Sequence, residues 1–352
     1  MNFASDNWAG VAPEIVDAIA AEAARVAPSY GSDDLTKSLE ARFAEVFEHD
    51  VAVFLVATGT AANALALSAV AKPAGLVFCH AEAHINSDEA GAPEFLGDVK
   101  LIGLEGPAGK VVPEALAAGL QRYAANSNRH GQPVALSLSQ LTELGAAYSA
   151  PGIAALSDLA HRAGIVVHMD GARFANAIDA TGLTPAEMTW KAGVDLLSFG
   201  ATKNGCLAAE AVVFFDRARA AEFAYLRKRA GHVVSKTRFI AAQFDAYFRD
   251  DLWLRLAAQS NGMASRLGDG IVDAGGRIAW PTDGNEVFAI IPRAGADRLK
   301  AAGANFYEWE PTRLPREMEP TGDEVFIRLV ASFTTTEQEV DRFVGILGED
   351  RR

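Results

Sequence analysis

Cysteine is scarce in this sequence, since its 352 residues include only Cys79 and Cys206. Neither belongs to a cluster with the spacing of metal ligands, so we interpret both as small buried hydrophobic side chains. The scarcity favours a reducing compartment, for which the cytoplasm is the simplest choice. We expect no metal site in this protein.

Basic residues are outnumbered, with 32 Lys and Arg against 45 Asp and Glu, a net charge of −13 and an isoelectric point near 5.0. This acidic balance argues against nucleic acid or an anionic membrane as a partner. No apolar run reaches the roughly 18 residues of a membrane span. The first residues lack the basic and then apolar pattern of a signal peptide, and we find no internal repeat.

The chain has the composition of a globular protein, with 50% hydrophobic and 22% charged residues, and it is long enough for two domains. Strand and helix patterns alternate from about residue 50 to 215, which predicts an α/β domain. After Arg249 the pattern changes to a long helix and several short strands. We therefore predict a large α/β domain over residues 1–248 and a small α+β domain over residues 249–352, with loops at 126–133 and 310–322.

Two neighbouring strand patterns of the α/β region end in functional residue types. Asp170 follows the apolar run 164–169, and Lys203 follows the run 194–200, 33 residues further on. Ligands of open α/β sheets bind at the carboxyl ends of strands. Pyridoxal phosphate needs a lysine for its Schiff base and a carboxylate beside its ring nitrogen. Singly, Asp170 could be a helix cap and Lys203 a solvated loop residue, but the pair favours this cofactor.

A turn that suits an anion follows the buried strand pattern 51–56. The residues Thr58, Gly59 and Thr60 stand between this strand and an Ala/Leu-rich helix. Free backbone N–H groups and the helix dipole favour a phosphate at such a helix start. The alternative is simple helix capping by a threonine hydroxyl. The cofactor hypothesis requires a phosphate site, and this turn is the candidate.

The sequence Asp170-Gly171-Ala172-Arg173, together with Thr-Lys-Asn-Gly around Lys203, resembles the threonine aldolase family. The resemblance extends from Ser5 to about residue 345. It implies the aspartate aminotransferase-like fold of fold-type-I enzymes, with a mostly parallel sheet, and pyridoxal 5'-phosphate as cofactor. It also implies cleavage of L-threonine, L-allo-threonine or related substrates such as phenylserine to glycine and an aldehyde. Homodimers or homotetramers with shared active sites are expected.

The resemblance also assigns roles to single residues. It implies that Ser5 and Arg328 contact the substrate carboxylate, that Arg173 binds a carboxylate or the ring's phenolate oxygen, and that Tyr30 reaches the active site of a neighbouring subunit. From the residues alone, Ser5 and Tyr30 could be ordinary turn residues. Arg328 lies in an otherwise apolar strand pattern, and it could instead face solvent.

The general base stays open between His84, Glu143 and a water molecule. His84 precedes Glu89 by five residues, and the resemblance implies that this histidine stacks on the cofactor ring. Many threonine aldolases have a histidine where this chain aligns Glu143, which is therefore a departure from the wider family pattern. His80 and His84 could also bind a metal with nearby glutamates, but they follow a strand directly and we do not favour this reading.

A small basic cluster, Arg227-Lys228-Arg229, closes the helix predicted for residues 217–228. It could complement the dipole of the helix, or it could neutralise a phosphate across a subunit interface. Two other functions remain: a different fold-type-I reaction such as β-elimination or transamination, and a catalytically silent scaffold with this fold. The aldolase reading accounts for the largest number of these residues.

Overall fold

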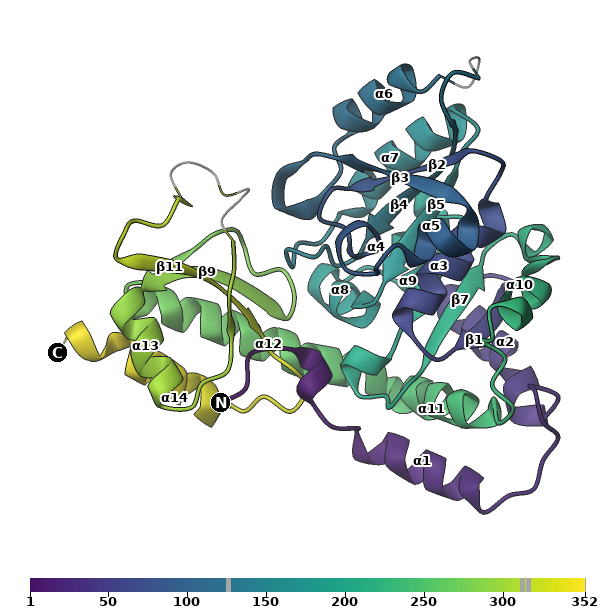
Figure 1. Cartoon of the computed structure of the whole chain (residues 1–352). Coiled ribbons are helices and arrows are strands. Elements are labelled where there is room, and N and C mark those ends of the chain that lie inside the picture. The colour runs from purple at the N-terminus through teal and green to yellow at the C-terminus, as the bar shows by residue number, and fades with distance from the viewer. Residues whose placement is uncertain (125–127, 311–313, 315–317, 352) are drawn as a thin grey trace.

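The computed structural model describes residues 1–124, 128–310, 314 and 318–351, and it shows two parts linked by a long helix (Figure 1). This helix, α12 (Leu252–Asp273), packs against α8 (Phe174–Thr181) of the large part and against β9 (Glu286–Pro292) of the small part. Parts of the loops predicted at 126–133 and 310–322 lie outside the described residues.

The large part is built on a sheet with the order β1-β7-β6-β5-β4-β2-β3 in the described residues. All neighbouring strands are parallel except at β7, which runs antiparallel to both β1 and β6. The predicted mostly parallel sheet is therefore confirmed. The strands are β1 (Ala52–Val56), β2 (Gly75–His80), β3 (Val99–Leu104), β4 (Gln132–Ser139), β5 (Val166–Gly171), β6 (Leu196–Gly200) and β7 (Glu210–Phe214).

Helices cover the sheet, and several of its strands are consequently buried along their whole length. Burial on both faces explains why these strands are continuous apolar runs rather than alternating ones. The remaining helices of this part are α1 (Pro13–Ala23), α2 (Asp34–Phe47), α3 (Gly59–Val70), α4 (His84–Ser87), α5 (Ala92–Gly97), α6 (Pro113–Arg122), α7 (Ala150–Arg162), α9 (Pro185–Met188), α10 (Phe223–Arg229) and α11 (Arg238–Phe248).

Phenylalanine rings fix the end of β6, from which the lysine loop emerges. Phe199 contacts the rings of Phe43, Phe47, Phe244 and Phe248, with ring centroids 5.6 to 6.1 Å apart. Phe199 is fully buried, and aromatic contacts at this spacing stabilise beyond the area that they bury. The core behind β6 therefore holds the strand end, and with it the loop that carries Lys203.

The small part contains an antiparallel sheet with the order β10-β11-β9-β8 in the described residues. Phe3 at the start of the chain is fully buried in its hydrophobic core, and the N–H of Val330 donates to the Phe3 carbonyl. The further elements are β8 (Arg277–Ile278), α13 (Arg293–Ala301), β10 (Tyr307–Glu308), β11 (Glu324–Val330) and α14 (Glu337–Leu347). A small C-terminal α+β part is thus confirmed, while the boundary at residue 248 stays a prediction.

One local prediction was wrong. The single helix predicted for residues 217–228 is divided into a 3-10 turn (Arg217–Ala220) and α10, which begins at Phe223. The Asp216 side chain caps the 3-10 turn, and Phe223 then turns into the core, so tertiary packing separates the two pieces. No described helix is long and apolar enough to cross a membrane.

Candidate active site

A cavity of about 310 Å³ lies at the edge of the sheet where the carboxyl ends of β1, β5 and β6 meet. Because β7 runs the other way, its amino end lies at the same edge. The cavity brings together predicted residues from distant segments, namely Thr58, Gly59, Thr60, His84, Asp170 and Lys203. The topology thus places the predicted lysine, acid and anion turn in one space.

The predicted anion turn is the start of α3. Thr58 is the N-cap, and its hydroxyl accepts a hydrogen bond from the Ala61 N–H at 3.2 Å. The Thr58 carbonyl accepts from the Ala62 N–H at 3.0 Å. The first N–H groups of a helix lack intrahelical partners, so those of Gly59 and Thr60 are left for a ligand. The capping and anion-binding readings of this turn are therefore compatible.

Asp170 is buried at the end of β5, where its carboxylate accepts two hydrogen bonds. The Ala172 N–H donates to Oδ1 at 3.0 Å, and the Asn63 amide donates to Oδ2 at 2.8 Å. The same Asn63 nitrogen donates to Glu89 Oε1 at 2.8 Å. A buried carboxylate held at both oxygens is a suitable partner for the ring nitrogen of the predicted cofactor.

Lys203 lies in a 3-10 turn, Thr202–Asn204, directly after β6. The buried Asn204 side chain anchors this turn by donating to the Tyr247 hydroxyl at 2.7 Å and to the Trp253 carbonyl at 2.8 Å. Within the described residues, the Lys203 amine has no hydrogen-bond or ion-pair partner. A held backbone with an unpaired amine facing the cavity is what a Schiff-base lysine requires.

His84 begins α4 and lines the same cavity as Lys203. Its Nδ1 lies 2.8 Å from Oε1 of the buried Glu89, so Nε2 is the ring nitrogen left for a ligand. The hydrogen bond to Glu89 raises the pKa of His84, and the charges of Glu143 and Asp170 add to this effect. The alternative metal reading is not supported by contacts, because His80 Nε2 instead lies 3.1 Å from the Gly106 carbonyl.

Glu143 follows β4 in the loop that packs against the small part. Burial raises its pKa, while the charges of Lys203 and Arg173 act in the opposite direction. Asp170 and His84 also lie close enough to influence it. The structure thus brings Glu143 to the same group of charges as the lysine and the histidine.

A chain of four charged side chains connects the two parts beside the cavity. Arg173 donates from Nε and Nη2 to the Asp6 carboxylate at 2.8 and 3.1 Å, and its Nη1 lies 3.5 Å from Glu286. Arg328 donates to Glu286 Oε1 at 2.6 Å and lies over the Trp309 ring. Arg173 is therefore engaged by carboxylates of the protein itself, and its predicted contact with a ligand stays a prediction.

The buried pair of Asp6 and Arg173 is expected to matter for stability. Burial alone would raise the pKa of Asp6, but the charges of Arg173 and Lys203 outweigh it and lower that pKa. We expect Asp6→Asn to reduce the unfolding free energy by about 3 kcal/mol, because it leaves a buried guanidinium undercompensated. Urea denaturation measures this change.

The matched control is Asp341→Asn, which breaks an exposed Arg–Asp pair with Arg266 at 2.8 Å. An exposed pair contributes at most about 1 kcal/mol, so this variant should unfold almost like the parent protein. Equal losses in Asp6→Asn and Asp341→Asn would contradict the proposed importance of the buried pair.

Five predicted residues are not among those that line this cavity: Glu143 and Arg173, described above, and Ser5, Tyr30 and Arg328. The Ser5 hydroxyl caps a 3-10 turn (Asp6–Trp8) by accepting from the Asn7 N–H at 3.1 Å. Tyr30 is 55% exposed and lies with the Lys228 amine 5.2 Å from its ring centroid, beside a separate cavity lined by Arg227. Arg328 contacts Glu286 instead. Their roles toward substrate stay predictions.

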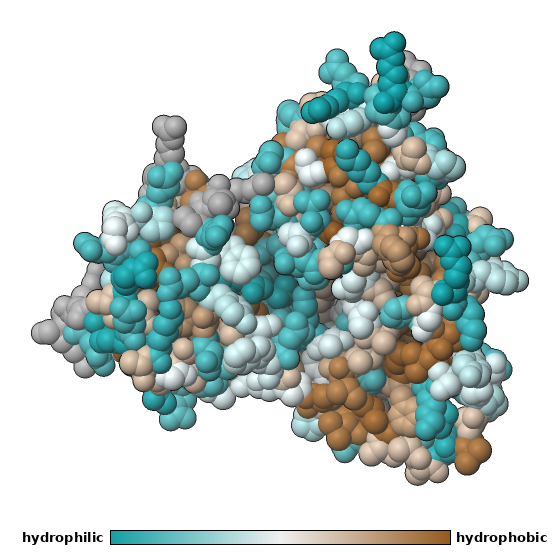
Figure 2. All heavy atoms as spheres, in the orientation of Figure 1, coloured by the Kyte–Doolittle hydropathy of each residue, from teal (hydrophilic) through white to brown (hydrophobic). Residues whose placement is uncertain are grey.

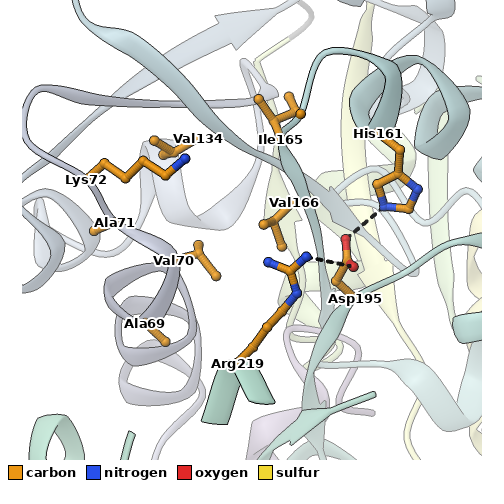
Figure 3. Close-up of a pocket in the computed structure, with 11 residues that line it drawn as sticks. Ala69, Val70, Ala71, Lys72, Val134, His161, Ile165, Val166, Asp195 and Arg219 are labelled. Carbon is orange, nitrogen blue, oxygen red and sulfur yellow. Dashed lines mark hydrogen bonds and ion pairs between the residues drawn. The ribbon is translucent and has the colours of Figure 1, made fainter. Parts of the chain in front are cut away.

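A larger cavity of about 600 Å³ lies at the opposite, amino-terminal edge of the sheet (Figure 3). Asp195 is paired there with His161 at 2.9 Å and with Arg219 at 3.8 Å, and it also accepts from the Val167 N–H. Three of its charged groups, Asp195, His161 and Arg219, thus already satisfy one another. A choice of active site by cavity volume alone would have favoured this cavity. The residues that suit the predicted cofactor line the smaller one.

Sequence reasoning missed several residues of the site, among them Asn63, Glu286 and Glu210. Glu210 and Glu286 are each an acid at the start of an apolar strand, the same signal that drew attention to Arg328. Asn63 had no such signal, because an asparagine in the first turns of a helix is common. The role of Asn63 follows from its hydrogen bonds to Glu89 and Asp170, which lie 26 and 107 positions further along the chain.

The residues of the cavity fit pyridoxal phosphate. Asp170 offers a buried carboxylate, and among the residues that the structure describes nothing pairs with the Lys203 amine or with the first two N–H groups of α3. Together with the mostly parallel sheet and the small C-terminal part, this set defines a fold-type-I enzyme with pyridoxal phosphate as its cofactor.

Comparison with known proteins agrees. Residues 2–294 match the family of beta-eliminating lyases, so the chain belongs to this family. It is 39% identical to the low specificity L-threonine aldolase of Pseudomonas aeruginosa over 308 residues, which cover 87% of this chain and 88% of that protein. The resemblance drawn from the motifs is thereby confirmed.

Two solved structures confirm the fold. A threonine aldolase from Leishmania major superposes with a TM-score of 0.92 at 28% identity, covering 100% of this chain and 99% of that one. The serine palmitoyltransferase of Sphingomonas wittichii superposes with a TM-score of 0.74 at 15% identity, covering 99% of this chain and 86% of that one. At this identity the second similarity concerns the fold alone.

Proposed function

We propose that this protein is an aldolase that cleaves L-threonine, L-allo-threonine and related β-hydroxy-α-amino acids, such as phenylserine, to glycine and an aldehyde. The observation that carries the proposal is the cavity in which Lys203, Asp170 and the Thr58–Thr60 turn meet, with His84 beside them. The threonine aldolases among its relatives support the substrate class.

The residues have distinct roles in holding the cofactor. Lys203 would bind its aldehyde carbon, Asp170 would face its ring nitrogen, and the N–H groups of Gly59 and Thr60 would receive its phosphate. When bound, pyridoxal phosphate supplies a ring that accepts the electrons of the bond that breaks. Asp170 would keep the ring nitrogen protonated, and Asn63 holds the Asp170 carboxylate in place by a hydrogen bond.

The substrate's orientation decides which bond at Cα is cleaved. Arg328, with Ser5, would bind the α-carboxylate, because Nη1 of Arg328 is left after Nε and Nη2 donate to Glu286. Arg173 would contribute through Nη1, which does not bond Asp6 but would have to share its charge with Glu286, 3.5 Å away. A carboxylate held on this side would set the Cα–Cβ bond in the geometry for cleavage.

His84 is our candidate for the base that takes the β-hydroxyl proton. Glu89 fixes its Nδ1, so Nε2 is the atom that would accept this proton. Glu143, or a water molecule that it orients, is the alternative.

The pH dependence separates these bases. We expect His84→Asn to reduce kcat/KM by about 10²-fold or more, the usual contribution of a general base. Glu143→Gln should retain the acid limb but move it to lower pH, because the Glu143 charge raises the pKa of His84 and its removal lowers it. If Glu143→Gln instead loses the acid limb while His84→Asn keeps it, Glu143 is the base.

The activity itself is tested by product analysis. The protein with pyridoxal phosphate should release glycine and one equivalent of aldehyde from L-threonine, L-allo-threonine and L-phenylserine, and little from their D enantiomers. The family also includes β-eliminating enzymes, as its description states. Release of a 2-oxo acid and ammonia without aldehyde would therefore refute the aldolase proposal in favour of elimination.

We also propose a homodimer or homotetramer with shared active sites in the cytoplasm. Tyr30 and Lys228 lie outside the cavity of their own chain, where a neighbouring subunit's site could use them. Trp8 and Leu207, at or next to the cavity lining, are 56% and 58% exposed. In Figure 2, hydrophilic residues line the hollow between the two parts, and hydrophobic ones gather around α1, where a second copy could cover them.

The proposed location in the cytoplasm is supported by the two cysteines, which are free and buried and therefore suit a reducing compartment.

A further inference from the structure

Glu210 is a buried acid that lines the cofactor cavity, and none of the cofactor contacts proposed above involves it. It is the first residue of β7, and it stands opposite Val56 of β1 and Gly200 of β6. The anion turn follows Val56 and the lysine loop follows Gly200. The strand register therefore places the Glu210 side chain between the phosphate-binding turn and Lys203, and it lines the cavity with only 6% of its surface exposed.

The surroundings of the Glu210 carboxyl group are those of a neutral acid. Its Oε2 atom lies 4.0 Å from the point where a Cβ on Gly59 would stand. Burial raises the pKa of Glu210 to about 7, and the charge of Asp170 adds to this effect. The nearby hydroxyl and N–H of Thr202 and the charge of Lys203 lower the pKa and limit the rise.

Within the described residues, Glu210 forms no ion pair with a basic side chain. The remaining titratable neighbours are the Cys206 thiol and the Tyr247 hydroxyl, both of which have raised pKa values because of burial and are neutral at physiological pH. An ionised Glu210 beside a phosphate dianion would repel it, whereas the protonated acid has an O–H to donate.

We propose that Glu210 is a further cofactor-binding residue, whose protonated carboxyl group donates a hydrogen bond to the phosphate held by the Gly59 and Thr60 N–H groups. This inference rests on the proposed use of pyridoxal phosphate. Binding of the phosphate and protonation of Glu210 then favour one another, so alkaline pH weakens the hold on the cofactor.

The test compares the dissociation constants of pyridoxal phosphate and pyridoxal, which lacks the phosphate. Both form the same bond with Lys203, so the ratio of their constants isolates the phosphate contribution. Between pH 7 and 9, where the phosphate stays a dianion, the preference of the parent protein for pyridoxal phosphate should fall by up to about tenfold per pH unit, as for one linked proton. In Glu210→Gln the amide donates at every pH, so the ratio should change by less than about twofold.

The matched control is Glu94→Gln on α5, outside the cavity, which should reproduce the pH slope of the parent protein. The inference would be overturned if the ratio of the two dissociation constants depended on pH as steeply in Glu210→Gln as in the parent protein. So would an equal loss of affinity for pyridoxal phosphate and pyridoxal, which indicates a structural role only. Neither result bears on the aldolase proposal. That proposal is refuted separately if the parent protein binds no pyridoxal phosphate or releases no aldehyde.

Discussion

The Lys203→Ala protein is expected to lack the visible absorption of a cofactor bound through a lysine, and to lose aldolase activity by about 10³-fold or more. The expectation follows from the site, because the Lys203 amine lines the cavity and is unpaired among the described residues. Its turn is fixed independently by the buried Asn204. The substitution should therefore remove the amine without unfolding the protein, as circular dichroism will show.

The control for this variant is Lys100→Ala, which removes an exposed lysine on β3. It should keep both the absorption and the activity of the parent protein. An active Lys203→Ala protein with an unchanged spectrum would show that another amine binds the cofactor, and the assignment of the site would be wrong.

The second large effect is expected for Asp170→Asn. The amide keeps the shape of the side chain but not the charge that holds a proton on the cofactor ring. We expect kcat to fall by about 10²- to 10³-fold, the loss typical of removing one preorganised electrostatic contact. Cofactor binding should fall much less, because Lys203 and the start of α3 remain.

Single-turnover kinetics with the cofactor at saturation separates these two effects of Asp170→Asn. Asp158→Asn, an exposed acid on α7, is the matched control and should be neutral. If Asp170→Asn retains full kcat and instead loses its cofactor, Asp170 has a structural role, in keeping with its hydrogen bonds to Asn63 and Ala172.

Asp170, Lys203 and the Thr58–Thr60 turn could be predicted because each follows a strand that is readable as an apolar run. In a parallel sheet, the carboxyl ends of such strands share one edge, so sequence order alone brings these residues near one another. The partners of these residues could not be predicted in the same way. Asn63 reaches Asp170 and Glu89 only because α3 packs across the strand ends.

The charged residues illustrate the same difference. Arg173 and Arg328 were expected to face a ligand, yet the structure pairs Arg173 with Asp6 and both arginines with Glu286. Asp6 and Glu286 come from opposite ends of the chain, and no local pattern records their proximity. Burial then demands that each charge be compensated, and the choice of partner is made by packing between the two parts.

The sequence by itself therefore determined the strands, the anion turn and the lysine and acid of the cofactor site, because periodicity and strand order are local properties. Only the tertiary structure decided which polar groups satisfy one another across the chain: Asn63 with Glu89 and Asp170, Asp6 with Arg173, and Glu286 with Arg328. Those pairings depend on burial and on distances between segments remote in sequence. They set the protonation of the site, which residue types alone do not.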